Sequence, residues 1–197
     1  MSFPLPPPIL TERLRLRLIE DTDLPALYGF YSDPAYVRYL PNPLWADASD
    51  GERWYKPVQA RTAEGSLMHF VVEQRATAQV IGICLLFNFD VASQRADVGY
   101  ALGPAHWGQR YAPEILQALL SLAFDTFGLR RVDATVDPRN LASAKTLLRC
   151  GFTHEGRQRE RSIIKGEAVD SSLYGLLRRE WLAHGVAAGA EHGSTSE

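Results

Sequence analysis

The chain has 197 residues, of which 46% are hydrophobic and 22% charged, and its formal net charge at pH 7 is -2. These values are typical of one globular domain, and they give no indication of nucleic acid or a membrane as a partner. The N-terminus lacks the basic and apolar regions of a signal peptide, and no apolar run is long enough to span a membrane. Cys84 and Cys150 lie among apolar neighbours, so we expect reduced thiols in a cytoplasmic protein. The spacing of the cysteines and histidines predicts no metal site.

The first half of the chain carries the patterns of strands and helices in alternation. Leucines at 14, 16 and 18 alternate with arginines, which predicts a strand with one solvent-facing side. A helix capped by Asp21 or Thr22 is expected to reach Tyr31, and a second helix is expected within 48–62. Three further strands are predicted at 66–74, 79–91 and 95–102.

The second half begins with a strong amphipathic helix that has Pro113 in its first turn and ends before Gly128. The remaining elements are predicted as a strand at 131–137, a helix at 140–150, strands at 152–164 and 168–177, and a short helix from Arg178 to about Gly185. The order β-α-α-β-β-β-α-β-α-β-β predicts an α/β domain with a mixed sheet and helices on both faces. We expect this domain at 10–184, between a proline-rich extended segment at 1–9 and a flexible tail at 185–197.

The segment 98–114 is the best candidate for a binding site. A predicted strand enters a short loop, and the loop opens directly into the helix that contains Pro113. First-turn amides of such a helix have no partner within the helix, and with the helix dipole they bind anions such as a diphosphate. Taken alone, the pattern is equally typical of an ordinary connection between a strand and a helix.

The same segment resembles the acetyl-CoA loop of the GNAT superfamily of N-acetyltransferases, most closely its RimJ/RimL-like branch of ribosomal-protein-alanine acetyltransferases. In this family the loop reads Gln/Arg-x-x-Gly-x-Gly/Ala, and its amides hold the pyrophosphate of coenzyme A. Position by position, the loop residues here are Trp107, Gly108, Gln109, Arg110, Tyr111 and Ala112. Further segments resemble family motifs in the right order, at 11–14, 137–143, 150–156 and 170–181.

The resemblance implies a GNAT fold and an acetyl-CoA-dependent N-acetyltransferase. Its acceptor would be a primary amine, either a protein N-terminus or a small molecule, which attacks the thioester directly. A GNAT-like protein that binds acyl-CoA as a sensor, without catalysis, is the alternative. Homodimers are common in this branch.

The resemblance also implies roles for individual residues. The strand ending at Ala101 and Leu102 would offer a main-chain amide to the thioester oxygen, with pantetheine between that strand and 131–137. Asp97 is the candidate base, although a carboxylate at a strand start is equally typical of a solvated surface. Ser143 is the candidate proton donor, because the position where many family members have Tyr is Leu147 here. Ser143 could equally bond local backbone.

Three assignments leave two interpretations open. Arg110 stands where the family usually has Gly, so we expect it to keep a negative φ and pair with phosphate; weakened affinity is the alternative. Asn140 is expected to cap the helix at 140–150 and also to contact pantetheine. Lys145 is a candidate for a coenzyme A phosphate, or else a solvated lysine.

Aromatic residues gather between 36 and 55. Tyr39, Trp45 and Trp54 are candidates for the wall of the acceptor site, and they could equally belong to the core.

Overall fold

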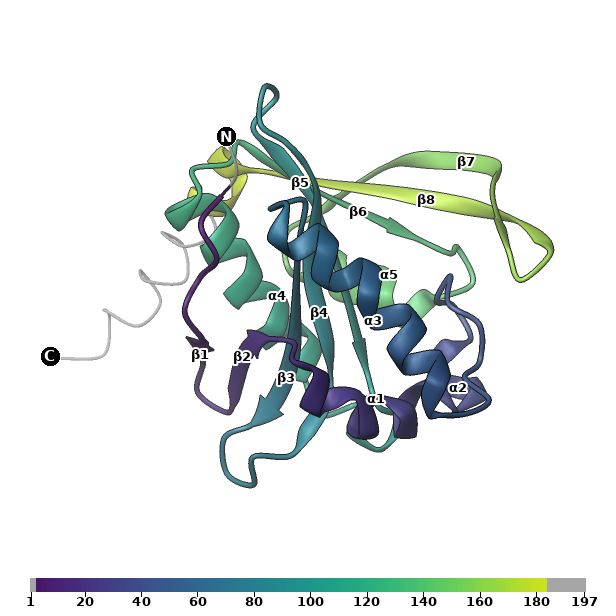
Figure 1. Ribbon diagram of the computed structural model, residues 1–197. Helices are drawn as coiled ribbons and strands as arrows, with labels where there is room; N and C mark the ends of the chain where they lie inside the picture. The colour runs from purple at the N-terminus through teal and green to yellow at the C-terminus, as the bar shows by residue number, and fades with distance from the viewer. Residues whose placement is uncertain (1–2, 184–197) are drawn as a thin grey trace, which may run out of the picture.

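A computed structural model describes residues 3–183 as an eight-stranded sheet with helices on both sides (Figure 1). The strands lie in the order β1-β2-β3-β4-β5-β6-β8-β7. All neighbouring strands are antiparallel except β5 and β6, which are parallel. The mixed α/β fold predicted from the sequence is therefore confirmed.

Two elements of the N-terminal half were not predicted, a short strand β1 and a single-turn helix α2. The elements of this half are β1 (Ile9–Leu10), β2 (Leu14–Leu18), α1 (Leu24–Tyr31), α2 (Pro34–Val37) and α3 (Ala48–Ala63). The predicted cap of the first helix at Asp21 or Thr22 is wrong. A 3-10 turn at Asp21–Asp23 precedes α1, and Glu20 caps it reciprocally with Asp23, whose Oδ2 accepts the Glu20 amide at 2.8 Å.

The later elements agree with the sequence predictions to within a few residues. They are β3 (Leu67–Gln74), β4 (Val80–Asp90), β5 (Arg95–Leu102), α4 (Tyr111–Ser121), β6 (Arg131–Val136), α5 (Leu141–Arg149), β7 (Thr153–Ile164) and β8 (Glu167–Leu177). A π-helical turn at Leu122–Thr126 continues α4 toward Gly128. A last helical turn occupies 178–183, and its predicted end near Gly185 lies outside the described residues.

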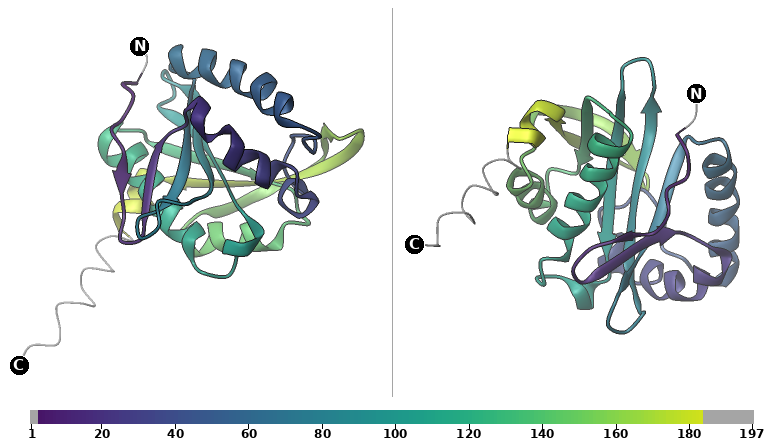
Figure 2. Two further views of the ribbon diagram at one scale, coloured as in Figure 1. Left: turned by 60° about the horizontal axis from the view of Figure 1, so that its bottom comes forward. Right: turned by 90° about the vertical axis from the view of Figure 1, so that its left-hand side faces the viewer.

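The sheet separates the core into two layers, and helices cover each of them (Figure 2). Helices α4 and α5 cover one face of the sheet, where Ile115, Leu119 and Leu147 are fully buried. Helices α1, α2 and α3 cover the other face, around Leu27 and Val71. None of the helices in 3–183 is both long and apolar enough to cross a bilayer.

Alternate residues of β5 face these two layers, as the pleat of a strand requires. Ala96 and Val98 belong to the core under α4, whereas Ala101 borders the core under α1 and α3. Side chains on either side of the sheet can therefore reach the same stretch of β5.

Candidate functional site

The sheet opens between its two parallel strands. Only residues 95–97 of β5 pair with residues 131–133 of β6. Farther along, β5 keeps β4 as its neighbour and β6 keeps β8, so within the described residues each strand has one edge without a partner. A ligand can add to such an edge as an extra strand would.

The hydrogen-bond register decides which amides face this opening. The Gly103 amide donates to the Ile81 carbonyl at 2.9 Å, and bonded pairs alternate along an antiparallel ladder. The amides of Tyr100 and Leu102 therefore point toward the opening, whereas the Ala101 amide points toward β4. Of the two residues suggested by the sequence as donors, only Leu102 presents its amide to the opening, and Tyr100 joins it.

Trp107 closes one end of this edge. Its indole Nε1 donates to the Leu102 carbonyl at 2.6 Å, while 53% of the residue remains exposed. The Leu102 carbonyl thus already accepts a hydrogen bond from Trp107. The main-chain amide of Leu102 is the group that remains available to a ligand.

The loop before α4 is built from two left-handed residues, Gly108 with φ 75° and Arg110 with φ 61°. The expectation that Arg110 keeps a negative φ is therefore wrong: the residue adopts a left-handed conformation that favours glycine. Among residues 3–183, the amides of 108–112 donate to no main-chain carbonyl, and no ion pair involves Arg110. Free amides, the N-terminal end of α4 and an unpaired guanidinium are groups that can bind an anion.

Ser143 lies in the first turn of α5 and is held from two directions. Its amide donates to the Asn140 side chain at 3.2 Å, which gives Asn140 the capping role expected of it. Its hydroxyl lies 3.0 Å from the Tyr100 hydroxyl. Burial raises the pKa of Tyr100, so this phenol stays protonated at neutral pH. Lys145, two residues farther along α5, is exposed.

Tyr100 had no role in the sequence analysis. The sequence does contain a signal for it. On the side of β5 that carries the apolar residues Ala96, Val98 and Leu102, Tyr100 is the one side chain that ends in a polar group. Its partner, however, lies 43 positions away in the chain.

Asp97 lies at the apex of the opening, where it is the last residue of β5 paired with β6, opposite Asp133. Its Oδ2 accepts a hydrogen bond from Asn88 Nδ2 at 2.9 Å, and Arg95 is 3.9 Å away. Burial raises the pKa of Asp97, and the negative charge of Asp133 adds to the increase. Asp133 itself is paired with Arg95 and Arg131, so Asp97 is the less neutralised carboxylate of the two.

The three aromatic candidates for the acceptor wall occupy different environments. Trp45 is 3% exposed and stacks on Tyr31 with centroids 4.4 Å apart, which places it in the core under α3. Trp54 is half-buried and packs edge-on against His69. Tyr39 is half-buried beneath the Arg38 guanidinium. Tyr39 and Trp54 thus keep surface for a ligand, and Trp45 contributes mainly to packing.

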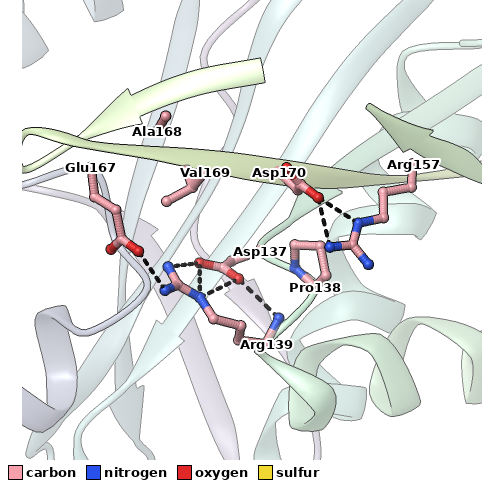
Figure 3. A pocket seen from close by; sticks show the side chains of 8 residues that line it. All are labelled: Asp137, Pro138, Arg139, Arg157, Glu167, Ala168, Val169 and Asp170. Atoms are coloured by element: carbon pink, nitrogen blue, oxygen red, sulfur yellow. Dashed lines mark hydrogen bonds and ion pairs between the residues drawn. The ribbon is translucent and has the colours of Figure 1, made fainter. Parts of the chain in front are cut away.

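A small polar cleft lies between the loop that precedes α5 and the β7–β8 hairpin (Figure 3). It is lined by Asp137, Pro138, Arg139, Arg157, Glu167, Ala168, Val169 and Asp170. Arg139 pairs with Asp137 at 2.7 Å and with Glu167 at 3.1 Å, and Arg157 donates to Asp170 at 2.7 Å. Of these pairs, only Arg139–Glu167 ties the hairpin to the loop that leads into α5.

The described residues include no group of three or more His, Cys, Asp or Glu side chains that could hold a metal ion. Both cysteines are buried free thiols.

Comparison with known proteins identifies the fold and the chemistry together. Residues 13–153 match the family described as "Acetyltransferase (GNAT) domain". The chain is 34% identical over 173 residues to the uncharacterized N-acetyltransferase p20 of Bacillus licheniformis, covering 88% of this chain and 97% of that protein. The chain belongs to the GNAT acetyltransferase family.

Two more relatives agree with this membership. The [ribosomal protein uS5]-alanine N-acetyltransferase of Escherichia coli strain K12 is 28% identical over 182 residues, covering 88% of this chain and 92% of that protein. A solved probable acetyltransferase of the GNAT family from Chromobacterium violaceum superposes with a TM-score of 0.81 at 26% identity, covering 92% and 90% of the two chains. This GNAT protein is thus an acyltransferase, and its acyl donor is acetyl-CoA, as the sequence resemblance implied.

Proposed function

We propose that this GNAT protein transfers the acetyl group of acetyl-CoA to a primary amine, by direct attack of the amine on the thioester. The observation that carries the proposal is the opened edge of β5, with free amides at Tyr100 and Leu102, leading into the free amides of the 108–112 loop. Acetyl-CoA has matching parts, a pantetheine arm that can add to a strand edge and a diphosphate that suits an anion site.

The residues around β5 fit the three requirements of acetyl transfer. The Leu102 amide donates to the thioester oxygen as negative charge develops there. Asp97 lies five residues before Leu102 on β5, so it accepts through intervening water the proton that the amine loses as its nitrogen bonds to the acetyl carbon. Ser143 donates a proton to the sulfur as the carbon–sulfur bond breaks. Asp97 and Ser143 then exchange these protons with water, so the products are an amide and a free thiol.

The base and the acid act from opposite faces of the sheet. Asp97 lies on the α1–α3 side of β5, because its neighbours Ala96 and Val98 point into the core under α4. Tyr100 packs against that same core and meets Ser143 of α5 there. The amine therefore approaches from the α1–α3 side, past Tyr39 and Trp54, while the thiol leaves toward α5.

For the acceptor, we propose an α-amine at a protein N-terminus, with small amines as the second class to test. The relative from Escherichia coli carries the name of an enzyme that acts on an alanine of ribosomal protein uS5. Buried free cysteines are consistent with a reducing compartment, and we propose a cytoplasmic location.

The test is release of free thiol from acetyl-CoA in the presence of peptides with different N-terminal residues, and of small amines in parallel. The proposal expects thiol release that depends on the amine, together with an acetylated amine detected by mass spectrometry. Stabilisation by coenzyme A without turnover of any amine would instead support an acyl-CoA sensor. Lack of both would refute the proposed ligand.

A further inference from the structure

Arg13, at the turn between β1 and β2, contacts the loop that precedes α4. Its Nη1 donates to the Gln109 carbonyl at 3.0 Å, and its Nη2 donates to the Arg110 carbonyl at 3.3 Å. One guanidinium thus binds two successive carbonyls of a loop 96 and 97 positions away in the chain.

These two bonds fix the direction of the amides that follow. In a trans peptide the carbonyl and the amide of one plane point in opposite directions. Every peptide bond in the described residues is trans. Because the Gln109 and Arg110 carbonyls point at Arg13, the amides of Arg110 and Tyr111 point away from it. They are two of the free donors of the proposed diphosphate site.

Arg13 is itself held rigidly. Glu114, in the first turn of α4, accepts Arg13 Nε at 2.7 Å and the Arg13 amide at 2.9 Å. The same carboxylate accepts the Thr11 hydroxyl at 2.5 Å. The guanidinium also lies over the Tyr111 ring, 4.5 Å from its centroid. Because Glu114 and the Tyr111 ring hold the Arg13 guanidinium in place, its two remaining donors can fix the orientation of the loop.

The loop needs such support. A left-handed residue other than glycine costs roughly 1–2 kcal/mol, and Arg110 adopts this conformation at the point where the chain enters α4. The carbonyls on both sides of the Arg110 amide, those of Gln109 and Arg110 itself, are the ones that Arg13 binds.

We propose that Arg13 is a positioning residue for the diphosphate of coenzyme A: it acts through the loop, by turning the amides of Arg110 and Tyr111 outward. This inference rests on the proposed function for the identity of the ligand. It assigns a role in cofactor recognition to a residue of the N-terminal strand pair, outside the loop and outside the helix that carry the free amides.

The experiment compares ligands with and without the diphosphate. Affinity for coenzyme A is measured by calorimetry, and kcat/KM is measured for acetyl-CoA and for S-acetylpantetheine, which lacks the diphosphate. The variants are Arg13→Gln and Arg13→Lys. Arg15→Gln is the matched control, because Arg15 lies two residues along, its side chain is 46% exposed against 42% for Arg13, and it pairs with Glu73 instead.

We expect Arg13→Gln to raise the Kd for coenzyme A about tenfold or more, as loss of charge-assisted hydrogen bonds implies. Turnover of S-acetylpantetheine should stay within about twofold, since no step with that donor uses the loop. Arg13→Lys should behave like Arg13→Gln, because an ammonium cannot bind two carbonyls and Glu114 in a fork. Arg15→Gln should change neither quantity.

Three results would overturn the inference: an unchanged Kd in Arg13→Gln, full recovery in Arg13→Lys, or an equal loss with both acyl donors. The second would mean that only the positive charge matters, and the third that the whole site is disturbed. If the parent protein acetylates nothing, the proposed function fails, but the calorimetry still decides the role of Arg13.

Discussion

The hydroxyls of Tyr100 and Ser143 lie 3.0 Å apart and connect β5 to α5, the helix that follows β6. The contact therefore ties the open edge of β5 to the helix that follows β6. A hydroxyl on its own is a weak acid, and a second hydroxyl that donates to its oxygen leaves its proton free for the departing sulfur.

A double-mutant cycle tests this contact. We expect Ser143→Ala to lower kcat about a hundredfold, as loss of a proton donor does. Tyr100→Phe removes one hydrogen bond and should lower kcat by roughly five- to tenfold. In the Ser143→Ala background the same change should have no further effect, because its partner is absent.

The matched control for the cycle is Tyr28→Phe, which removes a hydroxyl bonded to the Ala46 carbonyl of the main chain. Its kcat should equal that of the parent. Additive losses from Tyr100→Phe and Ser143→Ala would show that the two hydroxyls act independently.

Asp97→Asn should separate activity from stability. The amide cannot accept a proton, so kcat should fall on the order of a hundredfold. The Asn88 bond can persist, and a buried charge next to Asp133 is removed, so the Tm at pH 7 should stay the same or rise. A fall in both quantities would assign Asp97 to the structure instead.

Titration of Asp97 should change activity and stability in opposite directions. Because burial raises its pKa in the fold, kcat/KM should fall as the pH falls through that raised value, where the carboxylate becomes protonated. Its contribution to stability changes the other way: the folded state holds the proton more tightly, so stability decreases as pH rises from the unfolded pKa toward the raised value. A kcat/KM profile of the parent and Asp97→Asn checks the first sign.

Arg110 combines an unfavourable backbone with a favourable charge, and two substitutions separate them. Arg110→Gly removes the guanidinium and relieves the left-handed strain, so the Tm should rise while the KM for acetyl-CoA increases a few-fold. Arg110→Ala should raise the KM equally without the gain in Tm. Both variants should show a weaker dependence of KM on salt than the parent. An unchanged KM would mean that the guanidinium does not meet a phosphate.

His69 should contribute to acid denaturation. Burial lowers its pKa to about 4, from an ordinary value of 6.5. The unfolded chain is therefore protonated at His69 while the fold is not, and stability falls as the pH drops from about 6.5 to about 4, by roughly 3 kcal/mol. His69→Leu should flatten this part of the Tm profile. An unchanged slope would place the acid sensitivity elsewhere.

Local patterns were sufficient for most of the fold. The alternation in β2 and the amphipathic pattern that begins at Pro113 each determined an element without help from distant contacts. The family motifs then indicated acetyl-CoA and the segment around Trp107. The short elements β1 and α2 escaped prediction, because two and four residues are too few to show a period.

Local patterns could not predict contacts between residues that are far apart in the chain. The left-handed Arg110 has its carbonyl bonded to Arg13, 97 positions away. The partner of Ser143 is a tyrosine on another strand. For Trp45, the core position follows from its stacking on Tyr31 and from Gly51, where an added Cβ would come within 2.9 Å of the indole. Nothing in the run of aromatics distinguishes such a ring from one that lines a substrate site.

The sheet consists of two parts, β1–β5 and β6–β8. Only the short pairing of residues 95–97 of β5 with 131–133 of β6 joins them. Hydrogen–deuterium exchange should detect this directly. We expect the amides of Tyr100 and Leu102 to exchange readily in the free protein and to become protected when coenzyme A binds along the open edge of β5, whereas the Ala101 amide, which is bonded to β4, should exchange slowly in both states. By the proposed binding mode, coenzyme A takes the place of a strand beside β5, and we expect its binding to make the two halves of the sheet more rigid relative to each other.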